Sequence, residues 1–247
     1  MSPDFDAMYA ADPDPWSVRS SWYERRKLAV LLACLPHEHY ARGWEPGCGI
    51  GVGTAALAAR VGDLVASDGS PRAVAATRER TAALPHVRVL ESRLPESPLE
   101  GPVDLVVDAE FLYYLDDLAA ALATLWSTCA PGGHLVCVHW AHHPHDGHRS
   151  GVQLHGLLRQ AAAERDVPDT AEHRLGDRVA HGRHRGAQLR VLGHAGRSKT
   201  SRTKSSSRCS TRCRASCSAA ACRSRPCSWT PLWCPSCGWC AQCTQTR

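Results

Sequence analysis

Up to about Glu164, short apolar runs alternate with longer stretches whose apolar residues recur at helical spacing. The runs predict β-strands at Tyr40–Glu45, Leu64–Ser67, Val87–Leu90, Val103–Val107 and Leu135–Trp140. The longer stretches predict helices at Ser21–Leu35, Thr54–Arg60, Ser70–Leu84, Asp116–Thr128 and Ser150–Glu164. This alternation predicts an α/β fold, a Rossmann-like doubly wound and mostly parallel sheet with helices on both faces.

Residues with strong local preferences mark the ends of several predicted helices. Ser21 and Glu24 have the Ser-x-x-Glu spacing of a capping box, and Pro36 follows the helix that they begin. Ser70-Pro71 combines a capping serine with a proline at the first helical position. Pro131-Gly132-Gly133 predicts the end of the helix that precedes the last strand.

Between the first strand and its helix, glycine occupies every second position, at Gly47, Gly49, Gly51 and Gly53. Glycine at this spacing suits neither a helix interior nor a packed strand, because it loses the most backbone entropy and has no side chain to bury. The pattern is typical of a tight strand-to-helix turn whose backbone closely approaches a ligand. The first N–H groups of the helix then face that ligand.

Two nucleotide-type ligands compete for this turn. A dinucleotide-binding turn has Gly-x-Gly-x-x-Gly/Ala directly after the strand, and the frame that fits, Gly51 to Ala56, begins several residues too late. The well-placed frame is Glu-x-Gly-x-Gly-x-Gly, from Glu45 to Gly51. An acidic residue there would repel a pyrophosphate and suits the ammonium and sulfonium groups of S-adenosylmethionine. A glycine-rich loop without a ligand is the remaining alternative.

Four polar residues, Glu45, Asp68, Glu110 and His139, fall at or just past the ends of predicted strands. Ligands of doubly wound sheets bind beyond the carboxyl ends of the strands, so we expect these residues at one edge of the sheet. Asp68 is placed to accept hydrogen bonds from ribose hydroxyls, a role that dinucleotide-binding folds share.

Composition divides the chain into two unlike parts. The net charge of the 247 residues is +5, yet all 24 acidic residues lie within residues 1–177, and residues 178–247 carry 14 of the 29 Lys and Arg. Nine of the 13 cysteines lie between Cys209 and Cys243. We therefore predict an acidic globular domain over residues 1–177 and a basic, Cys/Ser/Arg-rich tail over residues 178–247. The lack of an apolar leader in Met1–Trp16 predicts a cytoplasmic protein without membrane contact.

With these features, the chain resembles class I S-adenosylmethionine-dependent methyltransferases, and within them the nodulation-S (NodS-like) family. The resemblance covers about residues 5–175. Its glycine motif is specific for the superfamily, and the Asp-Pro-Trp and His-Trp pieces indicate the branch. It is carried by Asp12–Trp16, Ser21–Lys27, Glu45–Gly51, Glu110–Leu115, Pro131–Leu135 and His139-Trp140.

The resemblance implies methyl transfer from S-adenosylmethionine to a free amine, which in nodulation-S proteins belongs to a deacetylated chitooligosaccharide. It implies contacts from Asp68 to the ribose and from Ser92–Leu94 to the adenine. Trp16 is expected either over the ligand or in edge packing. Arg93 and Gly69 depart from the family, which usually has an acidic and a branched residue there. The glycine motif implies that the methionine half of S-adenosylmethionine is contacted by Glu45, Gly47, Cys48, Gly49 and Gly51.

Methyl transfer to nitrogen is an in-line displacement, so the protein must chiefly align donor and acceptor and exclude water. An ammonium cannot attack, and an amine acceptor must therefore be neutral or lose a proton to a base. We predict His139 as that base, with Glu110 and Tyr113 next. Alternatively, Glu110 caps the following segment and Tyr113 packs. The histidines that follow Trp140 have no regular spacing, and we predict no metal site there.

The tail admits several interpretations. Thr170–Arg174 and Gln188–Leu192 could be remnants of the family's last two strands, so we predict a sheet that lacks or distorts its last hairpin. The composition beyond favours a disordered or frameshifted tail. A cysteine-rich metal site between Cys234 and Cys243, or a nucleic-acid-binding run at Arg197–Arg214, is the alternative. A methyltransferase of another small N or O acceptor, and an inactive relative, are further alternatives.

Overall fold

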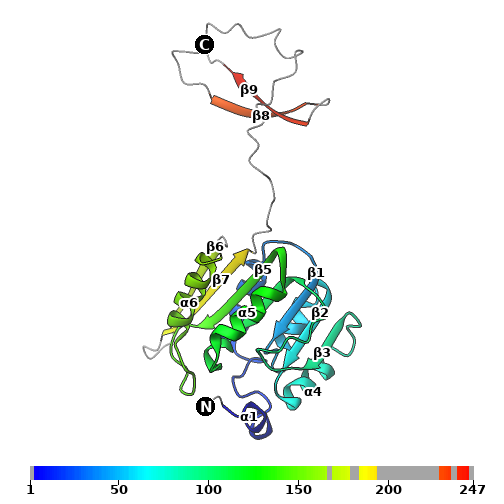
Figure 1. Ribbon diagram of the computed structural model, residues 1–247, viewed down its shortest axis with the longest axis vertical. Helices are drawn as coiled ribbons and strands as arrows, with labels where there is room; N and C mark the ends of the chain where they lie inside the picture. Colours follow the sequence, from blue (N-terminus) through cyan, green and yellow to red (C-terminus); the bar gives the residue numbers. More distant parts are fainter. Residues whose placement is uncertain (1–2, 166–168, 179–183, 194–227, 235–237, 245–247) are drawn as a thin grey trace. The chain divides into compact units, whose positions relative to one another are not determined.

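The computed structural model describes residues 3–165, 169–178, 184–193, 228–234 and 238–244, in two compact units, Met1–Ser198 and Lys199–Arg247. The first unit contains a seven-stranded sheet in the order β3-β2-β1-β4-β5-β7-β6 (Figure 1). Neighbouring strands from β3 to β5 are parallel, and β7 is antiparallel to both β5 and β6. This is the predicted α/β doubly wound sheet.

The strands of this sheet are β1 (Tyr40–Pro46), β2 (Val61–Asp68), β3 (Val87–Glu91), β4 (Val103–Ala109), β5 (Cys129–Trp140), β6 (Asp169–Arg178) and β7 (His184–Gly193). The α-helices are α1 (Phe5–Ala11), α2 (Trp22–Ala33), α3 (Val52–Leu57), α4 (Pro71–Arg80), α5 (Leu118–Thr128) and α6 (Gly151–Ala163). A short 3-10 helix, η1, spans Leu112–Tyr114.

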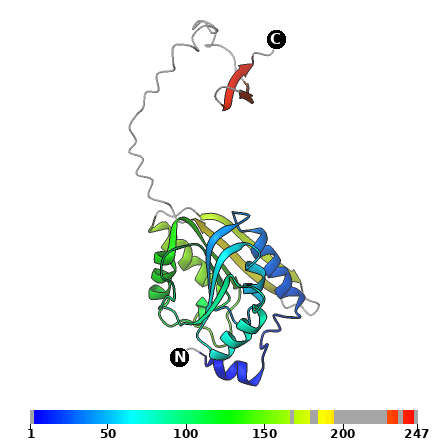
Figure 2. The same ribbon diagram turned by 90° about the vertical axis from the view of Figure 1, so that its right-hand side faces the viewer.

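Each face of the sheet has its own apolar core. Because side chains alternate along a strand, Trp44, Leu135 and Cys137 pack with α5 and α6 on one face. Val136 and Val138 pack on the opposite face, with residues of α2 and α3. Figures 1 and 2 show these helix layers on the two sides of the strands.

Local signals in the sequence account for the helix starts. Ser21, Ser70 and Asp117 each accept a hydrogen bond from a backbone N–H of the first turn, at α2, α4 and α5. Ser150 and Gln153 form a complete capping box at α6. The capped helices are therefore placed by residues that precede them in sequence.

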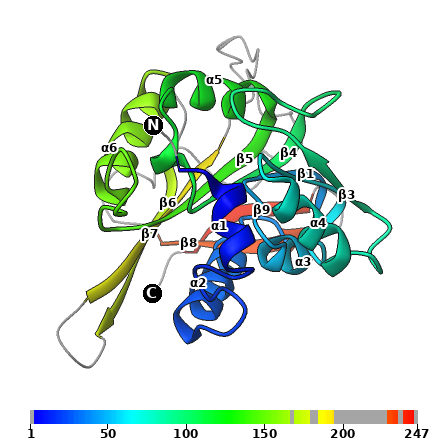
Figure 3. The ribbon, with the colours of Figure 1, turned by 90° about the horizontal axis from the view of Figure 1, so that it is seen from below.

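The order of the strands creates a switch point between β1 and β4. From β1 the chain proceeds outward through β2 and β3, then returns to place β4 on the other side of β1. The loops that follow β1 and β4 consequently diverge and leave a crevice at the carboxyl edge of the sheet. Figure 3 views this edge and shows α1 lying across it.

The last hairpin corrects the sequence prediction. We expected it to be missing or distorted, but β6 and β7 pair along their length and β7 pairs with β5 from Trp140 to His134. Leu189, Val191 and Leu192 of β7 are fully buried. The alternation of apolar and polar residues over 188–192 is short, yet it is enough to form a strand, because β5 lies beside β7 and pairs with it.

Two smaller differences concern the elements around this sheet. The segment before Asp12, for which no element was predicted, contains α1, whose first turn is capped by Asp4. β5 begins directly after α5, at Cys129, so the Pro-Gly-Gly sequence lies inside the strand. Gly132 has φ +84° there and lets the strand change register against β4.

The second unit contains two antiparallel strands, β8 (Ser228–Cys234) and β9 (Gly238–Thr244). The predicted domain boundary after residue 177 falls within β6 and stays a prediction. The basic run at 197–214 lies outside the described residues, so the disordered or frameshifted tail also stays a prediction. No described helix is long and apolar enough to cross a membrane.

Candidate functional site

The turn after β1 is built from glycines that other residues could not replace without strain. Gly47, Gly49 and Gly51 have φ of +68°, +55° and +76°. A Cβ on Gly47 would lie 2.6 Å from the Phe111 ring, and one on Gly51 would lie 2.9 Å from Thr77. The turn therefore combines a left-handed backbone with close packing, which exposes backbone along a cavity of about 1230 Å³.

Glu45 is a buried carboxyl at the start of this turn. Its side chain is 4% exposed, and Thr54 Oγ1 donates a 2.5 Å hydrogen bond to Oε2. Burial raises the pKa of Glu45 to about 7, and nearby Asp68 adds to the rise while the Thr54 hydrogen bond opposes it. A carboxyl held in this state is prepared for a cationic ligand, which would restore its charge.

Asp68 ends β2 beside the same turn. Its Oδ2 accepts a hydrogen bond from Gly49 N and its Oδ1 accepts one from Ser70 N, both at 2.9 Å. Burial raises the pKa of Asp68, although these hydrogen bonds and the charge of Arg93 act in the opposite direction. The carboxylate is thus fixed in orientation at the cavity wall, as the predicted ribose acceptor requires.

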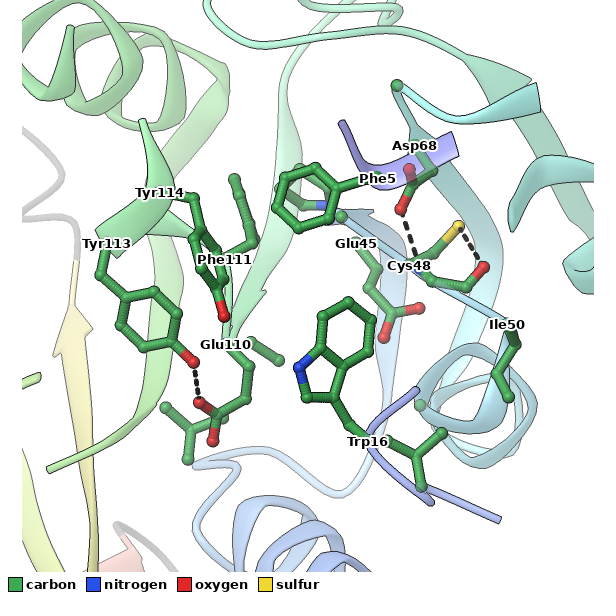
Figure 4. A pocket seen from close by; sticks show the side chains of 18 of the residues that line it. Phe5, Trp16, Glu45, Cys48, Ile50, Asp68, Glu110, Phe111, Tyr113 and Tyr114 are labelled. Atoms are coloured by element: carbon green, nitrogen blue, oxygen red, sulfur yellow. Dashed lines mark hydrogen bonds between the residues drawn. The ribbon is translucent and has the colours of Figure 1, made fainter. Parts of the chain in front are cut away.

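Aromatic residues from the N-terminal segment lie against the turn. Tyr9 Oη lies 3.0 Å from where a Gly49 Cβ would be, and Trp16 packs 5.8 Å from the Tyr9 ring. Phe5 packs between Trp16 and Tyr114, with its centroid 6.3 and 5.2 Å from theirs. Trp16, which is 40% exposed, therefore lines the cavity and packs at once. Figure 4 shows Phe5 and Trp16 between the two ends of the cavity.

The opposite end of the cavity is built around Glu110, directly after β4. Its backbone has φ +64°, and its Oε2 accepts hydrogen bonds from Tyr113 Oη at 2.5 Å and Trp140 N at 2.8 Å. Lys27 Nζ binds Oε1 at 2.5 Å. Burial alone would raise the pKa of Glu110, but the charge of Lys27 and the hydrogen bonds from Lys27 and Tyr113 lower it overall. Glu110 is therefore a fixed anion.

Lys27 was not singled out in the sequence. It is 7% exposed, contacts Glu24 Oε2 at 2.8 Å as well as Glu110, and lies 5.2 Å above the Tyr23 ring. Burial would lower its pKa, yet the two carboxylates raise it. Its position one helical turn after Glu24 was the only available signal, because the contact with Glu110 is a long-range one.

His139 lies differently from the prediction. Strand alternation turns its neighbours Val138 and Trp140 toward the cavity, and His139 toward α6. There its side chain is fully buried, with Nδ1 3.2 Å from His155 Nε2 and Nε2 3.4 Å from an Asp108 oxygen. Its ring packs edge-on to Tyr113, so it adjoins the site without lining it.

The structure brings together nearly all of the predicted cofactor-binding residues. Gly51 alone of that set does not line the cavity and packs against Thr77 instead. Among the described residues, no group of three or more His, Cys, Asp or Glu is arranged to hold a metal ion. The predicted cofactor-binding residues that line the cavity are Trp16, Glu45, Gly47, Cys48, Gly49, Asp68, Ser92 and Leu94, and Figure 4 labels Trp16, Glu45, Cys48 and Asp68 among them.

Comparison with known proteins gives consistent matches. Residues 44–135 match the family described as Methyltransferase domain. Nodulation protein S of Rhizobium tropici is 37% identical over an alignment of 145 residues that covers 54% of this chain and 60% of that protein. Nodulation protein S of Bradyrhizobium diazoefficiens is 31% identical over an alignment of 141 residues that covers 52% of this chain and 68% of that protein.

Among solved structures, N-methyltransferase NodS from Bradyrhizobium japonicum WM9, in complex with S-adenosyl-L-homocysteine, superposes with a TM-score of 0.65. The match covers 76% of this chain and 95% of that one, at 24% identity, and so supports the fold. The chain spans 60% and 68% of the length of the two curated relatives above.

Proposed function

This chain belongs to the nodulation-S family of class I S-adenosylmethionine-dependent methyltransferases, and we propose that it N-methylates an amino sugar or an amino-sugar oligosaccharide. The observation that carries the proposal is the pairing of two ends in one cavity. The glycine turn with Glu45 and Asp68 forms one end, and the partly buried anion Glu110 with Tyr113 forms the other. The first end suits the cofactor and the second suits an amine.

The residues at the glycine turn fit S-adenosylmethionine. The glycine turn is packed so closely that it has no room for side chains at its glycines, and it would therefore meet the cofactor with its backbone. The Glu45 carboxyl, whose pKa is raised, would regain its negative charge beside the ammonium of the cofactor. Asp68 would hold the ribose hydroxyls. When bound, the cofactor supplies an electrophilic methyl group.

The charge of the cavity favours a cationic acceptor over an anionic one. Its lining contains nine carboxyl side chains and three Lys or Arg side chains. Such a lining attracts a sugar ammonium and opposes a polycarboxylate. Aromatic faces add to the attraction through cation–π contact and can also pack against sugar rings. The carboxyl side chains are those of Asp14, Glu24, Glu45, Asp68, Glu96, Glu110, Asp116, Asp117 and Asp146.

Glu110 and Tyr113 would orient the acceptor nitrogen. With Lys27, Tyr113 and the Trp140 N–H around it, Glu110 stays ionised and is a weak proton acceptor. Its role is that of a fixed hydrogen-bond acceptor that aligns the amine. The acceptor ammonium would release its proton to solvent before the transfer, because only the neutral amine can attack the methyl group. The Tyr113 oxygen, whose proton is engaged by Glu110, presents its lone pairs to the acceptor N–H.

His139 is a positioning residue in this scheme. It cannot reach an acceptor directly because its side chain is fully buried, but its ring packs 5.2 Å from that of Tyr113. The contact would hold the Tyr113 ring in place. The aromatic residues of the N-terminal segment would exclude water over the reacting atoms.

Transfer of a labelled methyl group tests the proposal. The full chain is incubated with labelled S-adenosylmethionine and a panel of free-amine glucosamine oligosaccharides, with the fully N-acetylated oligosaccharides as matched controls that lack the amine. We expect label in the free-amine series alone, and much less with Glu110→Gln. Label in the acetylated series would favour an oxygen acceptor, and cofactor binding without label in any glycan would refute the amino-sugar assignment.

A further inference from the structure

Gly69 and Arg93 lie in contact across the cofactor end of the cavity. Arg93 Nη2 donates a 3.1 Å hydrogen bond to the Gly69 carbonyl. A Cβ on Gly69 would lie 3.0 Å from Arg93 Nε and 3.3 Å from its Cζ, tighter than ordinary contacts. The guanidinium therefore occupies the space that a side chain at position 69 would fill.

The backbone gives no other reason for glycine at this position. Gly69 is absent from the positive-φ glycines of the described chain, in contrast to Gly47, Gly49 and Gly51. Any L-residue could adopt its conformation. What opposes a side chain at position 69 is Arg93, so the two residues are a matched pair.

Arg93 is also placed beside the predicted nucleoside contacts. It lines the cavity with Asp68, Ser92 and Leu94, and Ser92 N donates a 3.0 Å hydrogen bond to the Asp68 carbonyl. This hydrogen bond joins the loop after β3 to the end of β2. The positive charge of Arg93 acts on Asp68, where it favours the ionised carboxylate.

We propose that the Arg93 guanidinium forms a wall of the nucleoside subsite in place of a side chain at position 69, and binds the adenosine half of the cofactor. The inference rests on the proposed cofactor site and adds a residue and a mode of contact to it. The family resemblance assigns no role to an arginine at this position.

The chemistry of arginine suits this wall. A guanidinium is planar and delocalised, stacks on aromatic rings, and donates hydrogen bonds to ring nitrogens and sugar oxygens. Its hydrogen bond to the Gly69 carbonyl fixes the plane without using most of its N–H donors. A lysine in the same place would keep the charge and lose the flat surface.

Binding measurements on the full chain test the proposal. Calorimetry would give the Kd of S-adenosylhomocysteine and of 5′-methylthioadenosine, which retains the nucleoside and lacks the amino acid. Loss of a stacked cation predicts that Arg93→Ala weakens both ligands about tenfold, and that Arg93→Lys restores little. Arg88→Ala is the matched control, because Arg88 lies on β3, just before the loop that carries Arg93, contacts Asp63 and does not line the cavity.

A double-mutant cycle separates direct contact from a general structural effect. Gly69→Val alone should weaken S-adenosylhomocysteine about fivefold, since the branched side chain displaces the guanidinium. In the Arg93→Ala background the same change should instead improve binding, because valine refills the vacated wall. Unchanged thermal unfolding midpoints would show that the variants are folded.

Three results would overturn the inference while leaving the cofactor site intact. These are an unchanged Kd in Arg93→Ala, additive effects of the two substitutions, and loss of S-adenosylhomocysteine affinity without loss for 5′-methylthioadenosine. Failure of the unmodified chain to bind S-adenosylhomocysteine would refute the cofactor site, and with it the role of Arg93.

Discussion

Glu45 is the residue at which the proposed role in cofactor binding and the stability of the fold oppose each other. Burial raises its pKa from an ordinary 4.5 to about 7 in the folded chain. Between these two values the folded protein holds a proton that the unfolded chain has released. The free energy of unfolding therefore falls as pH rises from about 4.5 to about 7, and the full penalty applies above 7.

Replacing Glu45 by glutamine should remove this penalty. At pH 8 we expect Glu45→Gln to raise the free energy of unfolding by about 2–3 kcal/mol, with little difference near pH 4.5. Urea unfolding at several pH values measures the effect. The same variant should bind S-adenosylhomocysteine much more weakly, since its amide cannot pair with an ammonium. Parallel pH profiles for the two proteins would contradict the burial of an uncompensated carboxyl.

Lys27 and Glu110 are expected to be strongly coupled. Lys27→Met should lower the free energy of unfolding by about 2–3 kcal/mol, because it leaves the partly buried Glu110 without its cation. The double variant Lys27→Met/Glu110→Gln removes both charges and should recover most of that loss. Denaturant unfolding of the four proteins gives the coupling energy. If the losses in free energy of unfolding of the two single variants simply add, Lys27 does not stabilise the charge of Glu110.

At the scale of elements, two glycines allow the effect of backbone strain to be separated from that of packing: Gly47 in the turn between β1 and α3, and Gly132 in β5. Gly47 and Gly132 both have positive φ, but a Cβ on Gly132 would meet nothing within 4 Å. Gly132→Ala should cost about 1 kcal/mol, the strain of the left-handed backbone, and leave S-adenosylhomocysteine binding unchanged.

Gly47→Ala carries the same strain and also drives a methyl group into Phe111. We expect it to cost about 2–3 kcal/mol and to weaken S-adenosylhomocysteine at least tenfold, because the turn must shift away from the cavity. Calorimetric binding and thermal unfolding of the two alanine variants, side by side, measure both effects. Equal losses of affinity would show that packing against Phe111 is unimportant.

Element boundaries show where local sequence was sufficient. The caps at Ser21 and Ser70 were recognisable because a cap depends on residues within one turn. α1 was not predicted, because seven residues are too few for helical periodicity to show in the sequence. Its aromatic residues Phe5 and Tyr9 pack against Tyr114 and Trp16 from other segments.

For the whole molecule, the position of β7 defines how much chain the fold requires. The compact unit extends to Ser198, and β7 lies between β5 and β6 within its sheet. A chain ending at residue 198 should keep its thermal unfolding midpoint within about 2 °C and its affinity for S-adenosylhomocysteine. One ending at residue 177 should not fold, since it loses the buried Leu189, Val191 and Leu192.

The pairing of β7 with β5 also bears on where in the gene a change of reading frame could lie. Residues 187–193 are buried and pair in register with β5, as a sequence selected for this fold would. A frame change after residue 177 would make that fit accidental. When the coding sequence is read in its other two frames, we expect any change of reading frame to lie beyond the codon for Gly193.

By itself, the sequence determined the α/β class and the glycine turn, and it predicted that Glu45 and Asp68 suit a cofactor with an ammonium and a ribose. These follow from periodicity and from residues close together in the chain. The tertiary structure decided that Lys27 pairs with Glu110, that Arg93 covers Gly69, and that His139 faces α6 instead of the cavity. Such contacts join residues far apart in sequence, and strand alternation decides which side chain of a strand end reaches the ligand.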